Sequence, residues 1–188
     1  MQFATAGDTV WIDAGVYTET VVIGVDNLAL IGKDSNATVI DPPGSNATAG
    51  IWGIYADTQT GLLIKTLGVT GAYNGIRLDN VDLSTVSNDS VSTCGNFAVY
   101  LLGGSDSNTL SGNQVVSNSN YGIELNGSSG NTLNNNISNS NSSSGFHLGS
   151  SSGNTISNNT SNSNTNFGID LAASSPGNTV SGNTTNSN

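Results

Sequence analysis

The chain has 188 residues, which fits one domain, and only 9% of them are charged, with a formal net charge of −10. Its three basic residues, Lys33, Lys65 and Arg77, disfavour nucleic-acid and acidic-lipid partners, which need clustered Lys and Arg. The longest apolar runs, such as Val21 to Ile23, are too short to cross a bilayer, so no membrane span is expected.

The first third of the chain predicts short strands separated by Gly and Asp turns. "GDTVWIDAGVYTETVVI", "NLALIG" and "ATVID" each join small runs of alternating or β-branched residues to turn residues. "GLLIKTLGVTGAYNGIRL" then opens a more regular part of the chain. We therefore expect a single domain over residues 1–188, with irregular coils over 1–60 and regular coils over 61–188.

The regular part is an internal repeat of 23 or 24 residues. One landmark is the small residue that opens the Gly-apolar-x-Leu motif, and a second is an Asn-Thr pair in fixed phase with it. A fixed period of this size indicates a solenoid. The first landmark falls at Gly75, Ala98, Gly122, Gly145 and Gly168, and the second at Asn108, Asn131, Asn154 and Asn178.

Alternating apolar residues predict that each repeat is built from strands with one buried face. The pairs are Ile76/Leu78, Val99/Leu101, Ile123/Leu125, Phe146/Leu148 and Ile169/Leu171. A further apolar column, on another strand of the same coil, is Leu63, Val86, Leu110, Leu133, Ile156 and Val180. No segment has helical spacing, so the fold class is an all-β parallel solenoid of about 22–24 residues per coil, stacked at roughly 4.8 Å.

Asparagine is the commonest sign of the repeat, with 28 residues, 21 of them after position 100. Asn tolerates the left-handed conformation of sharp corners, and stacked amides can hydrogen-bond from coil to coil. We expect two such ladders, one at Asn113, Asn136, Asn159 and Asn183, and one at Asn118, Asn141, Asn164 and Asn188.

The opening strands together with the "GNTISNN" and "GIDL" coils resemble right-handed parallel β-helix proteins of the pectate-lyase-like superfamily, with NosD-type and archaeal surface proteins nearest in look. The resemblance covers nearly the whole chain and implies a right-handed coil. It does not imply one activity, because this architecture serves lyases, hydrolases, esterases, adhesins and inert scaffolds. The copper or zinc role that NosD implies is not expected here, since ligands in a straight column converge poorly on one ion.

In each Gly-apolar-x-Leu segment the x residue points outward, so successive x residues form one column. The column is Tyr55, Arg77, Tyr100, Glu124, His147 and Asp170. Three interpretations stay open: a solvated charge ladder, a carbohydrate groove using all six residues, or catalysis by Arg77, Glu124, His147 or Asp170. Glu124 and Asp170 lie two rungs apart, about 9.6 Å, near the upper end for inverting glycoside hydrolysis. No metal or cofactor is expected.

Other conspicuous residues receive structural interpretations. Asp79 and Asp82 are expected in a turn after the strand, Trp11 and Trp52 in the core or at the end of the solenoid, and Cys94 as a partly buried free thiol. Neither a Gly-x-Ser-x-Gly elbow nor a phosphate loop is present, so other enzyme classes have no supporting motif.

The prediction for function is an extracellular or cell-surface structural or adhesive β-helix module. The sequence ends in mid-coil at "SGNTTNSN", which favours self-association end to end into filaments. The alternative is a polysaccharide-binding or polysaccharide-degrading domain. Nine sequons make glycosylation candidates of Asn36, Asn46, Asn88, Asn126, Asn136, Asn141, Asn158, Asn159 and Asn183.

Overall fold

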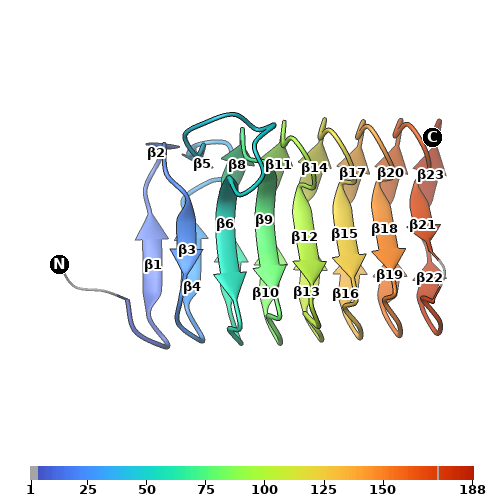
Figure 1. The fold of residues 1–188 in the computed structure, drawn as a ribbon, viewed down its shortest axis with the longest axis horizontal. Helices are drawn as coiled ribbons and strands as arrows, with labels where there is room; N and C mark the ends of the chain where they lie inside the picture. Colours follow the sequence, from blue (N-terminus) through green and yellow to red (C-terminus); the bar gives the residue numbers. More distant parts are fainter. Residues whose placement is uncertain (1–3, 173) are drawn as a thin grey trace.

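The computed structural model describes residues 4–172 and 174–188, which form 23 short strands and no helix. The strands wind into a parallel solenoid of about eight coils, with β1 at one end of the long axis and β23 at the other (Figure 1). The all-β prediction is therefore confirmed. The described residues contain no helix long and apolar enough to cross a membrane.

Three parallel sheets, here called sheets A, B and C, run along the axis; each of the first seven coils contributes one strand to each sheet, and the last coil contributes strands to sheets A and B. Sheet A consists of β1 (Thr9–Ile12), β4 (Ala29–Gly32), β7 (Leu63–Lys65), β10 (Thr85–Ser87), β13 (Thr109–Ser111), β16 (Thr132–Asn134), β19 (Thr155–Ser157) and β22 (Thr179–Ser181). Sheet B consists of β2 (Gly15–Tyr17), β5 (Thr38–Ile40), β8 (Gly68–Thr70), β11 (Ser90–Ser92), β14 (Gln114–Val116), β17 (Ile137–Asn139), β20 (Thr160–Asn162) and β23 (Thr184–Asn186).

Sheet C has the longest strands and carries the outward column. It consists of β3 (Val21–Ile23), β6 (Trp52–Asp57), β9 (Asn74–Asp79), β12 (Val99–Leu102), β15 (Ile123–Asn126), β18 (Phe146–Gly149) and β21 (Ile169–Leu171). In these strands the alternating pattern is obeyed: Ile123 and Leu125 are fully buried between outward neighbours.

The predicted apolar column on sheet A is correct except for its first member. Val86 pairs with Ile64, and Leu63 pairs with Thr85 on the outer face. Ile64 is fully buried, whereas Leu63 is only partly so. The run "LLIK" offers three adjacent apolar residues, and a shift of one residue moves a side chain to the opposite face of the strand.

The corners between sheets differ from the sequence prediction in which residue takes the left-handed conformation. The ladder asparagines do not take it; the residue before each of them does, as at Asn135 (φ 57°) before Asn136 and Ser140 (φ 56°) before Asn141. The exposed residue makes the turn, and the next side chain points into the solenoid. The ladder asparagines are thus interior residues, with Asn136 and Asn141 at most 1% exposed.

Hydrogen bonds between coils confirm both predicted asparagine ladders. The backbone N–H of Asn113 donates to Oδ1 of Asn136, at 3.0 Å, and Asn136 repeats the contact with Asn159, at 2.8 Å. Nδ2 of Asn136 donates to the Leu110 carbonyl of the preceding coil, at 2.8 Å. The second ladder and a third one follow the same backbone-to-Oδ1 pattern, the third at Asn108, Asn131, Asn154 and Asn178.

Burial also divides the nine sequons. Asn136, Asn141 and Asn159 are ladder residues with buried amides that donate inside the solenoid, so they are not glycosylation sites of the folded chain. Nδ2 of Asn183 and of Asn46 is likewise occupied, by the Ile156 and Thr93 carbonyls. The sequons with exposed asparagines are Asn36, Asn88, Asn126 and Asn158.

Candidate functional site

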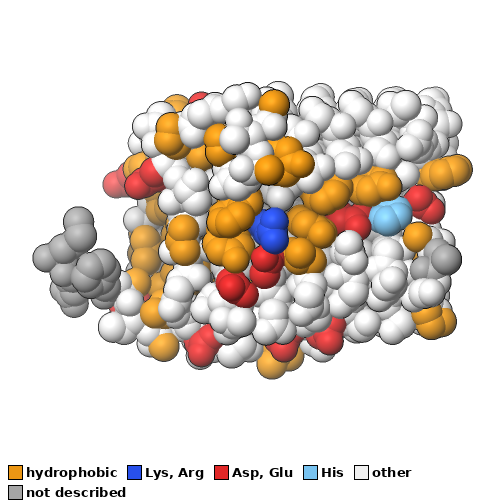
Figure 2. Space-filling view, in the orientation of Figure 1, with side chains coloured by type: hydrophobic (Ala, Val, Ile, Leu, Met, Phe, Trp, Pro, Cys, Tyr) orange, Lys and Arg blue, Asp and Glu red, His pale blue; other side chains and the backbone are white. Residues whose placement is uncertain are grey.

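The six residues of the outward column lie in one row on the outer face of sheet C, as the repeat predicts. Strand register pairs each with the next, in the order Tyr55, Arg77, Tyr100, Glu124, His147 and Asp170. Figure 2 shows this face: apolar groups surround the single Arg, and farther along the axis an acidic group, the His and a second acidic group follow. Functional roles for these residues stay predictions.

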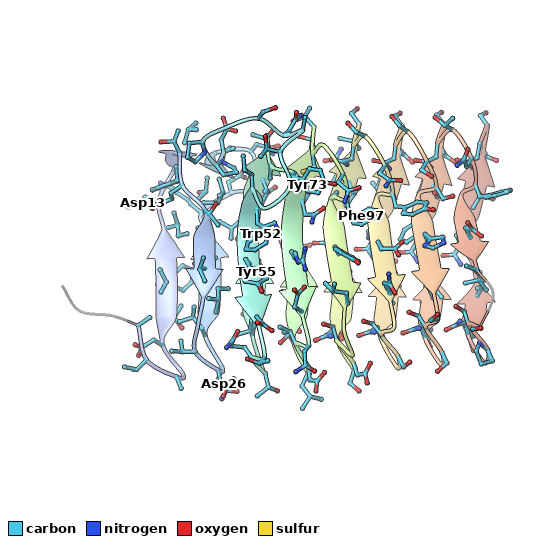
Figure 3. The ribbon with its side chains drawn as sticks, in the orientation of Figure 1. Asp13, Asp26, Trp52, Tyr55, Tyr73 and Phe97 are labelled. Atoms are coloured by element: carbon cyan, nitrogen blue, oxygen red, sulfur yellow. The ribbon has the colours of Figure 1, made fainter. Side chains whose placement is uncertain are left out.

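The first part of the row is an aromatic cluster around Arg77. The rings of Trp52 and Tyr55, both on β6, lie 4.1 Å apart between centroids (Figure 3). Cζ of Arg77 lies 5.3 Å from the Trp52 ring, 6.0 Å from Tyr55 and 5.6 Å from Tyr100, distances at which a cation is attracted to a ring face. Trp52 therefore lies on the outer face of sheet C, and its predicted place in the core or at an end is wrong.

Asp79 holds the Arg77 guanidinium in place. Arg77 Nε donates to Oδ1 of Asp79 at 2.9 Å and its Nη2 to Oδ2 at 2.7 Å, and this two-pronged contact raises the pKa of Arg77. Asp79 is the last residue of β9, so its predicted place in a turn is wrong. Asp82 does lie in the following turn, where its Oδ1 accepts from the backbone of Asp106, at 2.8 Å.

A second row of aromatic rings, missed by the sequence analysis, lies beside the column. Phe97 contacts Tyr100, with centroids 4.6 Å apart, and stacks on Tyr121 at 5.7 Å. Tyr121 stacks on His147 at 4.3 Å and 4° between planes. Trp52, Phe97 and Tyr121 each stand three residues before a column residue, so the same repeat phase was a signal that could have found them.

The structure also places Trp11 and Cys94, the other two residues for which the sequence predicted a structural role. Trp11 is 73% exposed on the outer face of sheet A, in the first coil, so its place at an end of the solenoid is confirmed. Cys94 is fully buried and free, and burial raises the pKa of its thiol to about 12. A buried thiol of this kind is an unreactive core residue.

The last part of the row consists of Glu124 and His147, which are hydrogen-bonded to each other, and of Asp170 on the other side of the His147 ring. Nδ1 of His147 lies 2.5 Å from Oε2 of Glu124, and its Nε2 lies 3.8 Å from Oδ2 of Asp170. Burial raises the pKa of Glu124. The hydrogen bond that the His147 ring donates to the Glu124 carboxylate raises the pKa of His147. Glu124 is only 3% exposed, so a ladder of solvated charges does not describe this part of the row.

This geometry limits the chemistry that the group can perform. The His147 ring occupies the space between the two carboxylates, where an inverting hydrolase would need a substrate and a water molecule. Glu124 is placed to orient His147, and His147 and Asp170 are the members with more exposed side chains. Among the described residues no group of three or more His, Cys, Asp and Glu side chains could hold a metal ion.

The fold and this face define a β-helix protein, and a comparison with known families agrees. The chain belongs to the family described as "Right handed beta helix region", whose model matches residues 30–185. The right-handed β-helix architecture that the resemblance implied is therefore confirmed. Among curated proteins no sequence match was found.

Several solved structures share the fold. The chain matches the periplasmic alginate epimerase AlgG with TM-score 0.63 and 14% identity, covering 86% of this chain and 46% of that one. It matches DFA-IIIase from Arthrobacter chlorophenolicus A6 with 0.67 and 17%, covering 87% and 38%. An alginate lyase from Paenibacillus sp. str. FPU-7 matches with 0.56 and 14%, covering 97% and 92%. The chain spans less than half of the first two proteins, and the particular likeness to NosD-type proteins stays a prediction.

Proposed function

We propose that the chain binds a polysaccharide along the outer face of sheet C. The observation that carries the proposal is the continuous row of aromatic rings and hydrogen-bonding groups from Trp52 to Asp170. Aromatic rings offer apolar platforms for sugar faces, while Arg and carboxylate groups bond to hydroxyl or acidic substituents. The named structural neighbours include an alginate epimerase and an alginate lyase, which supports this function over a purely structural module.

The row is also built to stay in position when a glycan binds. Arg77 is fixed by Asp79 and by three rings, and His147 is fixed by Glu124 and Tyr121. Side chains that are already ordered lose little conformational entropy on binding. An extended chain lying along the solenoid axis would contact successive rungs about 4.8 Å apart.

Binding can be tested by affinity electrophoresis and calorimetry with sodium alginate as an acidic glycan and a soluble neutral β-glucan. Trp52→Ala should weaken binding at least tenfold, because it removes the platform that stacks on Tyr55 and Arg77. Trp11→Ala is the matched control, since Trp11 lies on sheet A. Equal losses in the two variants, or no binding of either glycan by the unaltered chain, would refute the proposal.

Acid–base chemistry at His147 is a second candidate, favoured by its contact with the buried Glu124. A bound sugar near Nε2 could exchange a proton with the imidazole, whose pKa is raised by its hydrogen bond to the Glu124 carboxylate. Turnover of alginate, followed by new reducing ends or unsaturated products, should then be lost in His147→Asn and reduced in Glu124→Gln. Undiminished turnover in His147→Asn would exclude this role while leaving glycan binding untouched.

A polysaccharide-binding face and four exposed sequons support a place outside the cell, which we include in the proposal. Adhesion to a glycan-coated surface would use the same face. End-to-end self-association into filaments stays a prediction, which light scattering over a range of protein concentrations can test.

A further inference from the structure

The outer face of sheet A carries a regular array that the proposed function does not use. From β10 to β22 the strands read TVS, TLS, TLN, TIS and TVS, with the middle residue inward. Register places five threonines in one column, Thr85, Thr109, Thr132, Thr155 and Thr179. The parallel column is Ser87, Ser111, Asn134, Ser157 and Ser181, and the two columns are here called the Thr/Ser array.

The hydroxyl groups of the array form no hydrogen bond within the described part of the chain. Serines at the corners behave differently: Ser84 Oγ accepts from the backbone of Leu62 at 2.8 Å, and Ser105 Oγ donates to the Leu78 carbonyl at 3.0 Å. Ser87 is the most sheltered member of the array, at 7% exposed, and its hydroxyl on the array side has no protein partner but is open to solvent. Water is therefore the partner available to these hydroxyl groups.

The chemistry of the array excludes the ligands that suit the other face. Its five strands contain no charged residue and no aromatic ring, so neither ionic attraction nor stacking on a sugar is available. The array begins where Lys65 of β7 pairs with Ser87. Hydroxyl and methyl groups are left, together with the single amide of Asn134, and these groups form hydrogen bonds with water.

The spacing of the array fits a tetrahedral water lattice. Hydroxyl oxygens on neighbouring rungs repeat at about 4.8 Å, and a water at about 2.8 Å from both would be bonded at an angle of about 120°. This is close to the tetrahedral angle. Thr is stiff at χ1, which keeps the hydroxyls in a constant orientation, and four rung spacings extend the array over about 19 Å.

We propose that the Thr/Ser array is an ice-binding face. A crystal of ice presents an extended, regular lattice of tetrahedral water, and the array can hold a rank of waters in that geometry. Binding would be cooperative over the rungs, because each hydroxyl adds one weak contact to the same crystal face. The proposal concerns sheet A and does not depend on glycan binding at sheet C.

The test is ice recrystallisation in frozen sucrose with the full chain, together with thermal hysteresis and the shape of single ice crystals. We expect the unaltered chain to slow recrystallisation and to facet the crystals. Thr132→Tyr, at the centre of the array, should abolish both effects by lifting the ice surface away. Thr160→Tyr is the matched control, since Thr160 begins the outer face of β20 in sheet B with the same burial pattern.

Melting curves and circular dichroism of the two variants show whether both fold, and Thr132→Ser, which keeps the hydroxyl, should retain part of the activity. Absence of any effect of the unaltered chain on ice growth would overturn the proposal, as would equal losses in Thr132→Tyr and Thr160→Tyr. Retention on crystalline cellulose that Thr132→Tyr abolishes, without an effect of the unaltered chain on ice, would assign the array to a glycan surface and overturn the proposal as well.

Discussion

The two halves of the solenoid are built on the same coil but filled with different chemistry. In the N-terminal half the three inward corner positions hold Leu62, Leu67 and Ala72, all buried. From the fifth coil onward the same positions hold asparagine, and from the sixth coil the inward column of sheet B changes from valine to buried Ser138 and Ser161. One half excludes water with hydrocarbon, and the other half pairs its ladder amides and the Ser138 and Ser161 hydroxyls from coil to coil.

This difference shows that the corners of a parallel coil can be stabilised in two ways. Their interior must be filled by apolar side chains or by polar side chains that are hydrogen-bonded, and no particular residue type is required. Burial of apolar surface contributes about 25 cal/mol per Å², while each ladder bond contributes about 1 kcal/mol but costs more if one partner is lost. Ser138 Oγ, for instance, donates to the Gly145 carbonyl at 2.7 Å. The absence of a side chain at Gly122 leaves room for this hydroxyl. A polar interior is stable when every member has its partner.

The largest expected effect comes from a change that neither half can tolerate. Leu125→Asp places a charge at a fully buried position of sheet C, between Leu101 and Leu148. A buried unpaired charge costs several kcal/mol, comparable with the whole stability of a domain. The variant should be unfolded by circular dichroism, whereas Asn126→Asp, at the next and exposed position, should keep the native spectrum.

Exchanging the corner chemistry of the two halves should cost about 2–4 kcal/mol in each direction. Leu67→Asn leaves an amide in an apolar corner, and Asn136→Leu leaves the Asn113 N–H and the Leu110 carbonyl without partners. Urea unfolding of both variants measures the loss. If Asn136→Leu proves as stable as the unaltered chain, the amide ladder is not what holds the C-terminal half.

Asp89 stands at the boundary between the halves, as a carboxyl in an asparagine ladder. Its Oδ1 accepts from Leu67, while its buried Oδ2 has no partner, and burial raises the pKa of Asp89 to about 7. A raised folded-state pKa means that its contribution to stability is present below about pH 4 and is lost as pH rises to about 7. Asp89→Asn should remove this loss, stabilising the chain by a few kcal/mol above pH 7.

Thermal unfolding of the unaltered chain and of Asp89→Asn between pH 4 and pH 8 measures this boundary effect. The expected result is a slope of stability with pH in the unaltered chain that the amide variant lacks over this interval. Parallel curves would show that Asp89 does not titrate with folding.

The smallest effect is expected on the outer face of the C-terminal half. His147 Nδ1–H donates to the Glu124 carboxylate, which raises the pKa of His147, so titration of His147 contributes stability that is present below pH 6.5 and is lost as pH rises through the folded-state pKa. Glu124→Gln should lower the His147 pKa in an NMR titration and cost about 1 kcal/mol near pH 6. An unchanged titration curve would contradict the contact.

Most of the fold follows from the repeat, because identical side chains at a fixed period can pair with one another only in parallel coils. The row from Tyr55 to Asp170 was predicted for the same reason. Local ambiguity explains the errors: the adjacent apolar residues Leu63 and Ile64 allowed a slip of one residue, and the strand containing Asp79 runs on for six residues to Asp79 itself.

The sequence by itself therefore determined the solenoid, its period and the residues of each column, since these depend on spacing along the chain. Only the tertiary structure decided which atoms meet between columns. The stacking of Trp52 on Tyr55, the burial of Glu124 behind His147 and the unpartnered hydroxyls of the Thr/Ser array depend on side-chain directions and on the packing of neighbouring coils. A periodic sequence specifies the rung on which a residue lies, but its burial and its partners depend on the three-dimensional surroundings.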